Sequence, residues 1–254
     1  MKLYKMFFSP TGGTKKAADI VSGVWDCKII DVDLCDADCD FSQYKPEMDD
    51  VCIAAVPAYG GRVPEPALSR IREIDGGNAK TILMAVYGNR HYDDTFLELK
   101  NTLIMAGFQC VAAIAAVAEH SIVRQYAAGR PDKRDQVQLI EFSEKIKKAW
   151  KRNQLPKSVD VPGKEPYREY HGVPLKPKGN RKCDQCGLCA VQCPVKAIPE
   201  ENPSNTKESQ CISCMRCVAV CPNHARDLNK VMIMATTKKI KKACQDRKEN
   251  ELFL

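Results

Sequence analysis

Eight of the 14 cysteines lie in two short runs whose spacing suits iron chemistry. Residues 183–194 are CDQCGLCAVQCP, and residues 211–222 are CISCMRCVAVCP. Both runs have the form C-x-x-C-x-x-C-x-x-x-C-P. Three cysteines at this spacing wrap one corner of a four-iron cube, and the fourth cannot turn back to it, so it binds the neighbouring cluster. The spacing therefore predicts two [4Fe–4S] clusters.

The crossed arrangement assigns each cysteine to one cluster. The first ligand set is Cys183, Cys186, Cys189 and Cys221; the second is Cys211, Cys214, Cys217 and Cys193. Zinc sites use paired C-x-x-C steps with four ligands per ion, and would leave the third and fourth cysteine of each run unused. Disulfides need an oxidising compartment, and such crowded cysteines suit them poorly. Both alternatives are weaker than iron–sulfur.

These runs resemble those of bacterial ferredoxins with two [4Fe–4S] clusters, and the sequence CPVKAI at 193–198 is also typical of them. One position departs from the internal repeat. Gly187 of the first run is matched by Met215 in the second, and Arg216 follows it. A bulky side chain and a cation near the second cluster support the hypothesis that its reduction potential is the higher one.

A different chemistry is indicated near the start of the chain. Apolar residues 3–8 run into the loop SPTGGT (9–14), which is followed by an expected helix at 15–24. Backbone amides, hydroxyls and a helix N-terminus together hold phosphate groups, and glycine allows close approach. The loop has neither the Walker nor the G-x-G-x-x-G spacing. A plain turn with Thr14 as N-cap is the alternative interpretation.

Two more loops follow expected strands. The apolar run 51–56, typical of a central parallel strand, leads into PAYGGRVP (57–64), and the strand expected at 81–87 leads into GNRHYDD (88–94). Ligands of open α/β sheets bind at the carboxyl ends of the strands. These loops are therefore expected to join residues 9–14 around one ligand.

The elements that position the three loops alternate along the chain. Strands are expected at 3–8, 27–32, 51–56, 81–87 and 108–117, and helices at 15–24, 64–74, 95–106 and 132–151. This alternation predicts an α/β fold, a flavodoxin-like doubly wound parallel sheet of order 2-1-3-4-5. A small α+β ferredoxin-like module with two clusters is expected to follow it.

The three loops resemble the flavin-contacting loops of flavodoxins, which implies FMN as cofactor. In that family the first loop binds the phosphate, and aromatic residues stack on the flavin ring. The resemblance implies stacking by Tyr59 and Tyr92, a peptide flip at Gly60–Gly61 near the flavin, and hydrogen bonds from Asn89 and Asp93 to the ring edge. The full expected FMN set is Ser9, Thr11, Gly12, Gly13, Thr14, Pro57, Ala58, Tyr59, Gly60, Gly61, Gly88, Asn89, Arg90, Tyr92 and Asp93.

A few other residues have side chains that could react or bind a metal. Cys52 and Cys110 lie in expected strands and are interpreted as buried apolar fillers. Cys35 lies in an acidic stretch that we expect to be an exposed loop rather than a metal site. If the chain reduces a substrate, proton donors are sought in the loop 119–130, where His120, Arg124 and Tyr126 are the candidates.

Charge and composition divide the chain. Residues 1–150 carry 19 Lys and Arg against 21 Asp and Glu, whereas residues 151–254 carry 20 against 11. Two clusters with their thiolates add about −4, so the basic half compensates them and does not indicate a nucleic-acid protein. No apolar run is long enough to span a membrane, so a cytoplasmic location is expected, with the cysteines reduced or metal-bound.

The expected domains are an FMN domain (1–152), a linker (153–180), a two-cluster domain (181–235) and a C-terminal helix and tail (236–254). Tyr167, Tyr170 and Val173 suggest that the proline-rich linker packs along the body. A basic helix is expected at 237–250, and the apolar ending after it is expected to dock on the body.

As a whole, the chain resembles the flavodoxin–ferredoxin fusion proteins of anaerobic bacteria. This resemblance implies a soluble electron carrier that passes single electrons between two [4Fe–4S] clusters and FMN, and that serves redox partner proteins. The alternative is an FMN-dependent reductase of a small substrate, fed by the clusters. No nicotinamide-binding fingerprint is present, which disfavours direct oxidation of NAD(P)H.

Overall fold

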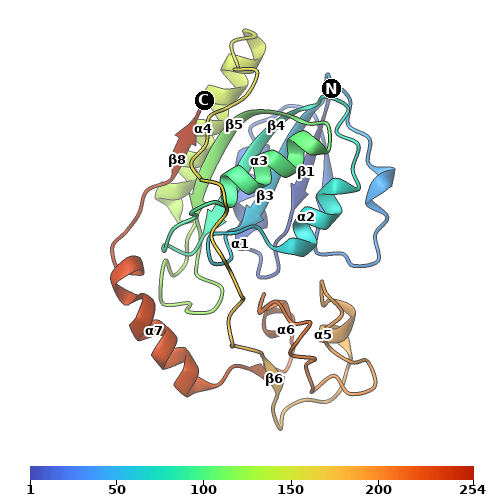
Figure 1. The fold of residues 1–254 in the computed structure, drawn as a ribbon, viewed down its shortest axis with the longest axis vertical. Helices are drawn as coiled ribbons and strands as arrows, with labels where there is room; N and C mark the ends of the chain where they lie inside the picture. The colour runs from blue at the N-terminus through green and yellow to red at the C-terminus, as the bar shows by residue number, and fades with distance from the viewer.

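A sheet with helices on both faces occupies one half of the computed structural model, which describes all of residues 1–254 (Figure 1). The strand order is β2-β1-β3-β4-β5-β8. The first five strands are parallel, so the predicted order 2-1-3-4-5 is confirmed. The strands are β1 Lys2–Phe7, β2 Lys28–Asp33, β3 Val51–Pro57, β4 Lys80–Tyr87, β5 Gln109–Val117 and β8 Glu251–Phe253.

Four helices cover the sheet and form a core on each side of it. They are α1 Gly13–Ser22, α2 Glu65–Arg72, α3 Thr95–Met105 and α4 Lys133–Lys151, and a short 3-10 helix, η1 Phe41–Gln43, follows β2. Helices α1 and α4 share one core of 18 buried residues, and α2 and α3 share the other, of 29. Cys52 and Cys110 are buried within strands, as predicted. The sheet domain therefore has an ordinary apolar interior of its own.

The last strand was not predicted as a strand. β8 pairs antiparallel with β5 and extends the sheet at that edge. The side chain of Asn250 secures the approach to β8, because its Oδ1 accepts the Val117 N–H at 2.8 Å and its amide donates to Gln138 and Asp135. The expectation that the apolar ending lies on the body is confirmed.

Helix α7, Lys230–Cys244, precedes this strand and begins earlier than the predicted residue 237. It starts at residue 230 because the Asn229 side chain accepts the N–H groups of Val231 and Met232, which caps the helix there. Figure 1 shows α7 bridging the cysteine-rich module and β8. No helix of the chain is long and apolar enough to cross a membrane.

The cysteine-rich module is an internal repeat that contains little regular structure. It holds β6 Lys178–Gly179, α5 Leu188–Val191, α6 Arg216–Ala219 and β7 Arg226–Asp227. Equivalent residues of the two runs share left-handed backbone conformations, namely Gln185 and Ser213, Gly187 and Met215, and Lys196 and His224. Met215 thus keeps the backbone of Gly187, at φ 64°, although it has a side chain.

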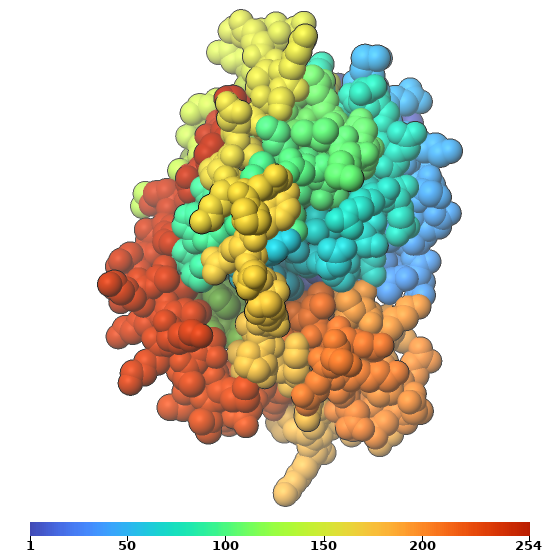
Figure 2. All heavy atoms as spheres, viewed as in Figure 1, coloured from blue at the N-terminus to red at the C-terminus, as the bar shows by residue number.

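The module packs against the carboxyl edge of the sheet (Figure 2). The Arg70 guanidinium of α2 lies in this interface and donates to the Leu34 carbonyl at 2.5 Å and the Pro194 carbonyl at 2.6 Å. Arg216 reaches in the opposite direction, from the module to the Pro10 carbonyl at 3.5 Å. The linker runs along the surface of the body, and the backbone N–H of Arg168 donates to Asp94.

Candidate functional site

The first predicted ligand set surrounds one cavity. Cys183, Cys186 and Cys189 line it together with Cys221, which comes from the second run. Cys189 is buried, and its pKa is raised by burial and by the neighbouring Cys183 and Cys221 thiolates, while Arg226 opposes the rise. The crossing of the fourth cysteine between the runs is therefore present in the fold.

In the second predicted ligand set, Cys193 of the first run packs in one small core with Cys217, and Cys211 lies against that core. Burial raises the pKa of Cys217 to about 11, and the charges of Cys211 and Cys193 add to the rise. Cys214 is also buried, and its pKa is raised well above its ordinary value by burial and by Cys217 and Cys193. Thiols in such surroundings ionise when an iron centre binds them.

Backbone amides already point at several of these sulfur atoms. The Ala197 N–H donates to Cys193 Sγ at 3.2 Å, and the equivalent Ala225 N–H donates to Cys221 Sγ at 3.2 Å. Hydrogen bonds of this kind stabilise thiolates and tune iron–sulfur centres. No group of three or more His, Cys, Asp or Glu side chains converges closely enough for a single metal ion. The donor chemistry, eight thiols with amide support, fits two clusters.

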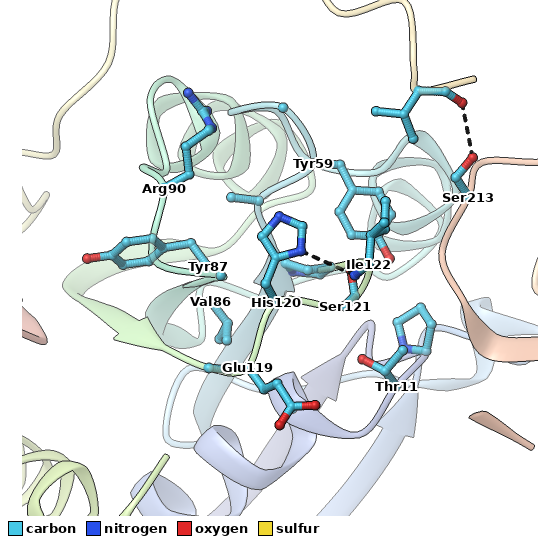
Figure 3. Close-up of a pocket in the computed structure, with 18 of the residues that line it drawn as sticks. Thr11, Tyr59, Val86, Tyr87, Arg90, Glu119, His120, Ser121, Ile122 and Ser213 are labelled. Atoms are coloured by element: carbon cyan, nitrogen blue, oxygen red, sulfur yellow. Dashed lines mark hydrogen bonds between the residues drawn. The ribbon is translucent and has the colours of Figure 1, made fainter. Parts of the chain in front are cut away.

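A second cavity, of about 200 Å³, lies at the carboxyl ends of β1, β3, β4 and β5 (Figure 3). Parts distant in sequence close over it, namely the linker, the cysteine-rich module and α7. Their lining residues are Tyr170, Val173, Ile212, Ser213, Thr236 and Ile240. The cavity thus lies where an open α/β sheet binds its ligand, and the second cysteine run forms part of its wall.

The phosphate-like loop has the predicted form with two differences. Gly12, not Thr14, is the N-cap of α1; it adopts φ 90° and makes no side-chain cap, and no acidic residue lies in the first turn. The first N–H groups of a helix have no partner within it, so they remain able to bind an anion. Thr11, Gly13 and Thr14 line the cavity. The Ser9 hydroxyl does not line it and accepts the Lys15 N–H at 2.8 Å.

The second loop makes a tight turn beside the cavity. Tyr59 and Arg62 exchange backbone hydrogen bonds of 2.9 and 3.1 Å around Gly60 and Gly61, which have φ of 61° and 88°. Two successive left-handed residues define a type I′ turn, which glycines adopt freely. Pro57, Ala58, Tyr59 and Gly60 line the cavity; Gly61 does not, and its carbonyl accepts the Asp94 N–H at 3.0 Å.

Tyr59 also connects the cavity with the second cysteine set. The pKa of its phenol is raised well above the ordinary value by burial, and then by the charges of Cys214, Cys35 and Tyr170. Its hydroxyl end therefore lies close to a predicted iron ligand while its ring lines the cavity. Cys35 is itself buried and accepts the Ser9 N–H at 3.2 Å, so the expectation of an exposed loop is wrong for this residue.

The third loop contributes less than predicted. Gly88 and Arg90 line the cavity, whereas Asn89, Tyr92 and Asp93 do not. The Asn89 amide donates to the carbonyls of Cys244 and Asp246, which anchors the end of α7. The side chains of Tyr92 and Asp93 also bond to distant segments, at Glu251 and Arg168.

The prediction that Tyr92 stacks on a flavin is wrong, because Tyr92 does not line the cavity. Its ring is buried in the sheet core, edge-on to Tyr87 and Phe96, and its hydroxyl donates to Glu251 at 3.1 Å. Asp93 pairs with Arg90 and with Arg168 of the linker instead of reaching a ring edge. Two of these partners, Glu251 and Arg168, come from the tail and the linker, which local sequence patterns do not place.

The linker supplies an aromatic residue that was not assigned to the site. The Tyr170 ring packs so closely on Gly60 that a Cβ at that glycine would lie 2.2 Å from Tyr170 Cδ2. Tyr170 and Tyr59 line the cavity together. The sequence signal was the run of aromatic residues in the linker, which indicated packing on the body without indicating where.

Of the three candidate proton donors, only His120 lines the cavity (Figure 3). Its Nδ1 accepts the N–H groups of Ile122 and Val123 at 3.2 and 3.1 Å, so the neutral ring carries its proton on Nε2. Burial and the nearby Arg90 lower the pKa of His120, despite an opposing backbone hydrogen bond. Arg124 pairs with Glu119 at the surface, and the Tyr126 hydroxyl donates to the Thr237 carbonyl at 2.9 Å.

Comparison with known proteins supports the description of the cysteine-rich module. A family model for the 4Fe-4S dicluster domain matches residues 182–245. No curated protein matches the chain. The chain thus joins a 4Fe-4S dicluster domain to a sheet with the strand order of flavodoxins.

Solved structures similar to the sheet domain include several flavodoxins. A flavodoxin of Streptococcus pneumonia TIGR4 is 16% identical over 58% of this chain and 99% of its own, with a TM-score of 0.42. A Fusobacterium nucleatum flavodoxin bound to flavin mononucleotide is 13% identical over 58% of this chain and 97% of its own, at TM-score 0.41. Rubredoxin oxygen:oxidoreductase from Desulfovibrio gigas is 17% identical over 59% of this chain and 36% of its own, at 0.43. The fold assignment rests on the strand order itself.

Proposed function

We propose that this protein is an electron carrier that passes single electrons between two [4Fe–4S] clusters and FMN and serves redox partner proteins. One observation carries the proposal. The cavity that begins at the phosphate-like loop is walled on its far side by Ile212 and Ser213, which lie inside the second cysteine run. A flavin in the cavity and a cluster on that run would be separated by little more than these side chains.

In this proposal the eight cysteines of the two runs hold the clusters, in the two crossed sets. Thr11, Gly13 and Thr14 receive the phosphate of FMN at the start of α1, where the cavity meets open N–H groups. Tyr59 and Tyr170 flank the flavin ring, and Gly60 lies against it. The flavin would take up two electrons, or one at a time, whereas each cluster carries one. It would therefore connect two-electron with one-electron chemistry.

The chain's own residues would hold these groups and exclude water. Tyr170 and Val173 of the linker, with Thr236 and Ile240 of α7, cover the cavity. Tyr59 lies between the cavity and Cys214, so its position supports electron transfer along that direction. We assign residues 1–152 to the FMN domain, 153–180 to the linker, 181–235 to the cluster domain and 236–254 to the C-terminal helix and tail, with β8 completing the sheet of the first domain.

His120 favours one alternative function. Its Nε2–H is available for donation because Nδ1 is occupied by two backbone N–H groups. A neutral donor beside a flavin suits an FMN-dependent reductase of a small substrate, fed by the clusters. The cover over the cavity favours the carrier, since a substrate needs an open route to the flavin.

The test is anaerobic purification with iron, sulfide and flavin measured per chain, followed by stepwise reductive titration. We expect about eight irons per chain, as two cubane clusters require, and one FMN. Full iron without flavin would contradict the FMN assignment, and zinc in place of iron would contradict the whole proposal. Steady turnover of a small acceptor that His120→Ala abolishes would favour the reductase.

A further inference from the structure

Arg226 is the largest fully buried side chain of the protein, at 1% exposure. It follows the second cysteine run, in strand β7. It lines the cavity of Cys183, Cys186, Cys189 and Cys221. Strand β7, which carries Arg226, also packs against helix α6, which carries Cys217 of the second set. One guanidinium therefore borders both predicted clusters.

This buried cation has no counter-charge among the side chains. Its Nη atoms donate to carbonyls, namely Pro203 at 2.6 Å, Asn205 at 3.2 Å and Pro177 at 2.9 Å, and to the Thr206 hydroxyl. No carboxylate forms an ion pair with it, although the protein contains many other ion pairs, and its Nε has no hydrogen-bond partner. Buried charges are costly unless they are paired, so a negative partner is missing from the protein itself.

The internal repeat shows that the fold does not require an arginine here. CPVKAI at 193–198 matches CPNHAR at 221–226, so Ile198 occupies the position equivalent to Arg226. The preceding residues, Ala197 and Ala225, make the same 3.2 Å hydrogen bond to sulfur. Ile198 packs in the small core of the module, as an apolar residue should. The first half of the repeat therefore folds with an apolar side chain at this position, whereas the second half has the charged Arg226 there.

We propose that Arg226 is the shared counter-ion of the two clusters, and that it raises the reduction potential of both. The inference rests on the proposed function only in that the cysteines must hold two clusters. Each cluster with its thiolates is an anion, and it becomes more negative by one charge when it takes up an electron. A fixed cation in a buried site stabilises that added charge. Its donors to carbonyls hold the guanidinium in place in both oxidation states.

The experiment is a mediated redox titration of both clusters, followed by EPR, in the native protein, Arg226→Met and Arg226→Lys. Methionine keeps an unbranched side chain without the charge, and lysine keeps the charge. We expect Arg226→Met to decrease the equilibrium constant for reduction of each cluster at least tenfold, which is about 59 mV for one electron. Arg226→Lys is expected to retain most of the native value. Lys182→Met, which removes an exposed cation next to Cys183, is expected to shift the potentials much less because solvent screens it.

Iron and sulfide content separates this inference from the proposed function. Two clusters with unmoved potentials in Arg226→Met would overturn the counter-ion role and leave the proposed function intact. Equal shifts in Arg226→Lys and Arg226→Met would also overturn it, because the charge would then not be the cause. Failure of cluster assembly in the methionine variant alone would support the role, and failure in both variants would contradict it. A native protein without iron would overturn both proposals.

Discussion

The two halves of this protein are stabilised in different ways. The sheet domain has two apolar cores of 29 and 18 buried residues, whereas the core of the cysteine-rich module has six, three of which are cysteines. The module's helices α5 and α6 have four residues each, and its two strands have two. Cores this small rarely hold a fold without a metal or a disulfide. Burial of apolar residues therefore stabilises the sheet domain, whereas the fold of the module depends on the groups that its cysteines bind.

Removal of one cysteine should produce the largest effect, and only in the module. Cys214→Ser takes a buried ligand from the second set, and we expect the loss of about four irons per chain while the sheet remains folded. Iron analysis and circular dichroism check this. Cys27→Ser, at a partly exposed cysteine of the sheet domain, should retain all the iron. Equal iron loss in both variants would contradict the ligand assignment.

The sheet domain should be most sensitive where the tail is fastened to it. The Asp135 side chain is almost fully buried and accepts from Arg130, Arg247 and Asn250. Asp135→Asn breaks this buried network and should lower the free energy of unfolding by about 3–5 kcal/mol. Chemical denaturation followed by Trp25 and Trp150 fluorescence measures it. Arg134→Gln removes the exposed pair with Glu249, and should cost less than about 1 kcal/mol.

The Asp135 carboxylate should also make the stability of the fold depend on pH, in a direction that its lowered pKa defines. Burial raises the pKa of Asp135, but hydrogen bonds from Arg130, the Asp132 loop and Asn250 outweigh it and hold the pKa below its usual value. A lowered folded pKa stabilises the fold fully above the unfolded value of about 3.9, and this contribution is lost as pH falls through the lowered value. Denaturation of Asp135→Asn should therefore depend less on pH in that acidic range than denaturation of the native protein.

The interface between the halves should respond to Arg70 more than to the surface pair beside it. Arg70→Met removes two charged hydrogen bonds, to Leu34 and Pro194, and should increase hydrogen exchange around Pro194 on the order of tenfold. Hydrogen exchange with mass spectrometry measures this. Asp38→Asn removes the ion pair with Lys196, whose side chains are 71% and 64% exposed, and should change little. The reverse order of effects would contradict the role given to Arg70.

The smallest effect should come from the cover over the cavity. Tyr170→Ala removes the ring that packs on Gly60, and we expect FMN to bind about five- to tenfold more weakly, since aromatic stacking contributes about 1 kcal/mol. Titration of the flavin-free protein with FMN, followed by flavin fluorescence, measures it. Tyr167→Ala is the control, because Tyr167 contacts Arg62 and Asn101 outside the cavity. Equal affinities in both variants and the native protein would sink the stacking role of Tyr170.

The parts of the fold with a strong local pattern could be predicted from the sequence. The unbroken apolar run at β3 predicted a central strand, and the capping pair Asp132 and Asp135 lies where α4 was expected to begin. The cysteine spacing predicted which sulfurs share a cavity at the first ligand set, Cys221 included. In each case the signal lies within a few residues of the structure that it specifies.

The parts that depend on distant partners could not be predicted. Tyr92 has the sequence context of a flavin-contacting loop, but its hydroxyl bonds to Glu251 across the chain. Tyr170 lies in a linker without periodicity, and only its contact with Gly60 brings it into the site. β8 has three residues, too few for an alternating pattern, and it forms because the edge of β5 is free to pair.

The position of β8 imposes an order on synthesis. Residues 1–151 can build the five parallel strands and α4 as they leave the ribosome, but the free edge of β5 stays open until residues 251–253 arrive. Both cysteine runs emerge in the interval, at translation rates of about 5–20 residues per second. The segment that must join the two edges of the sheet is therefore the cysteine-rich module, whose own apolar core is small. The sheet edge closes only after both cysteine runs have been synthesised.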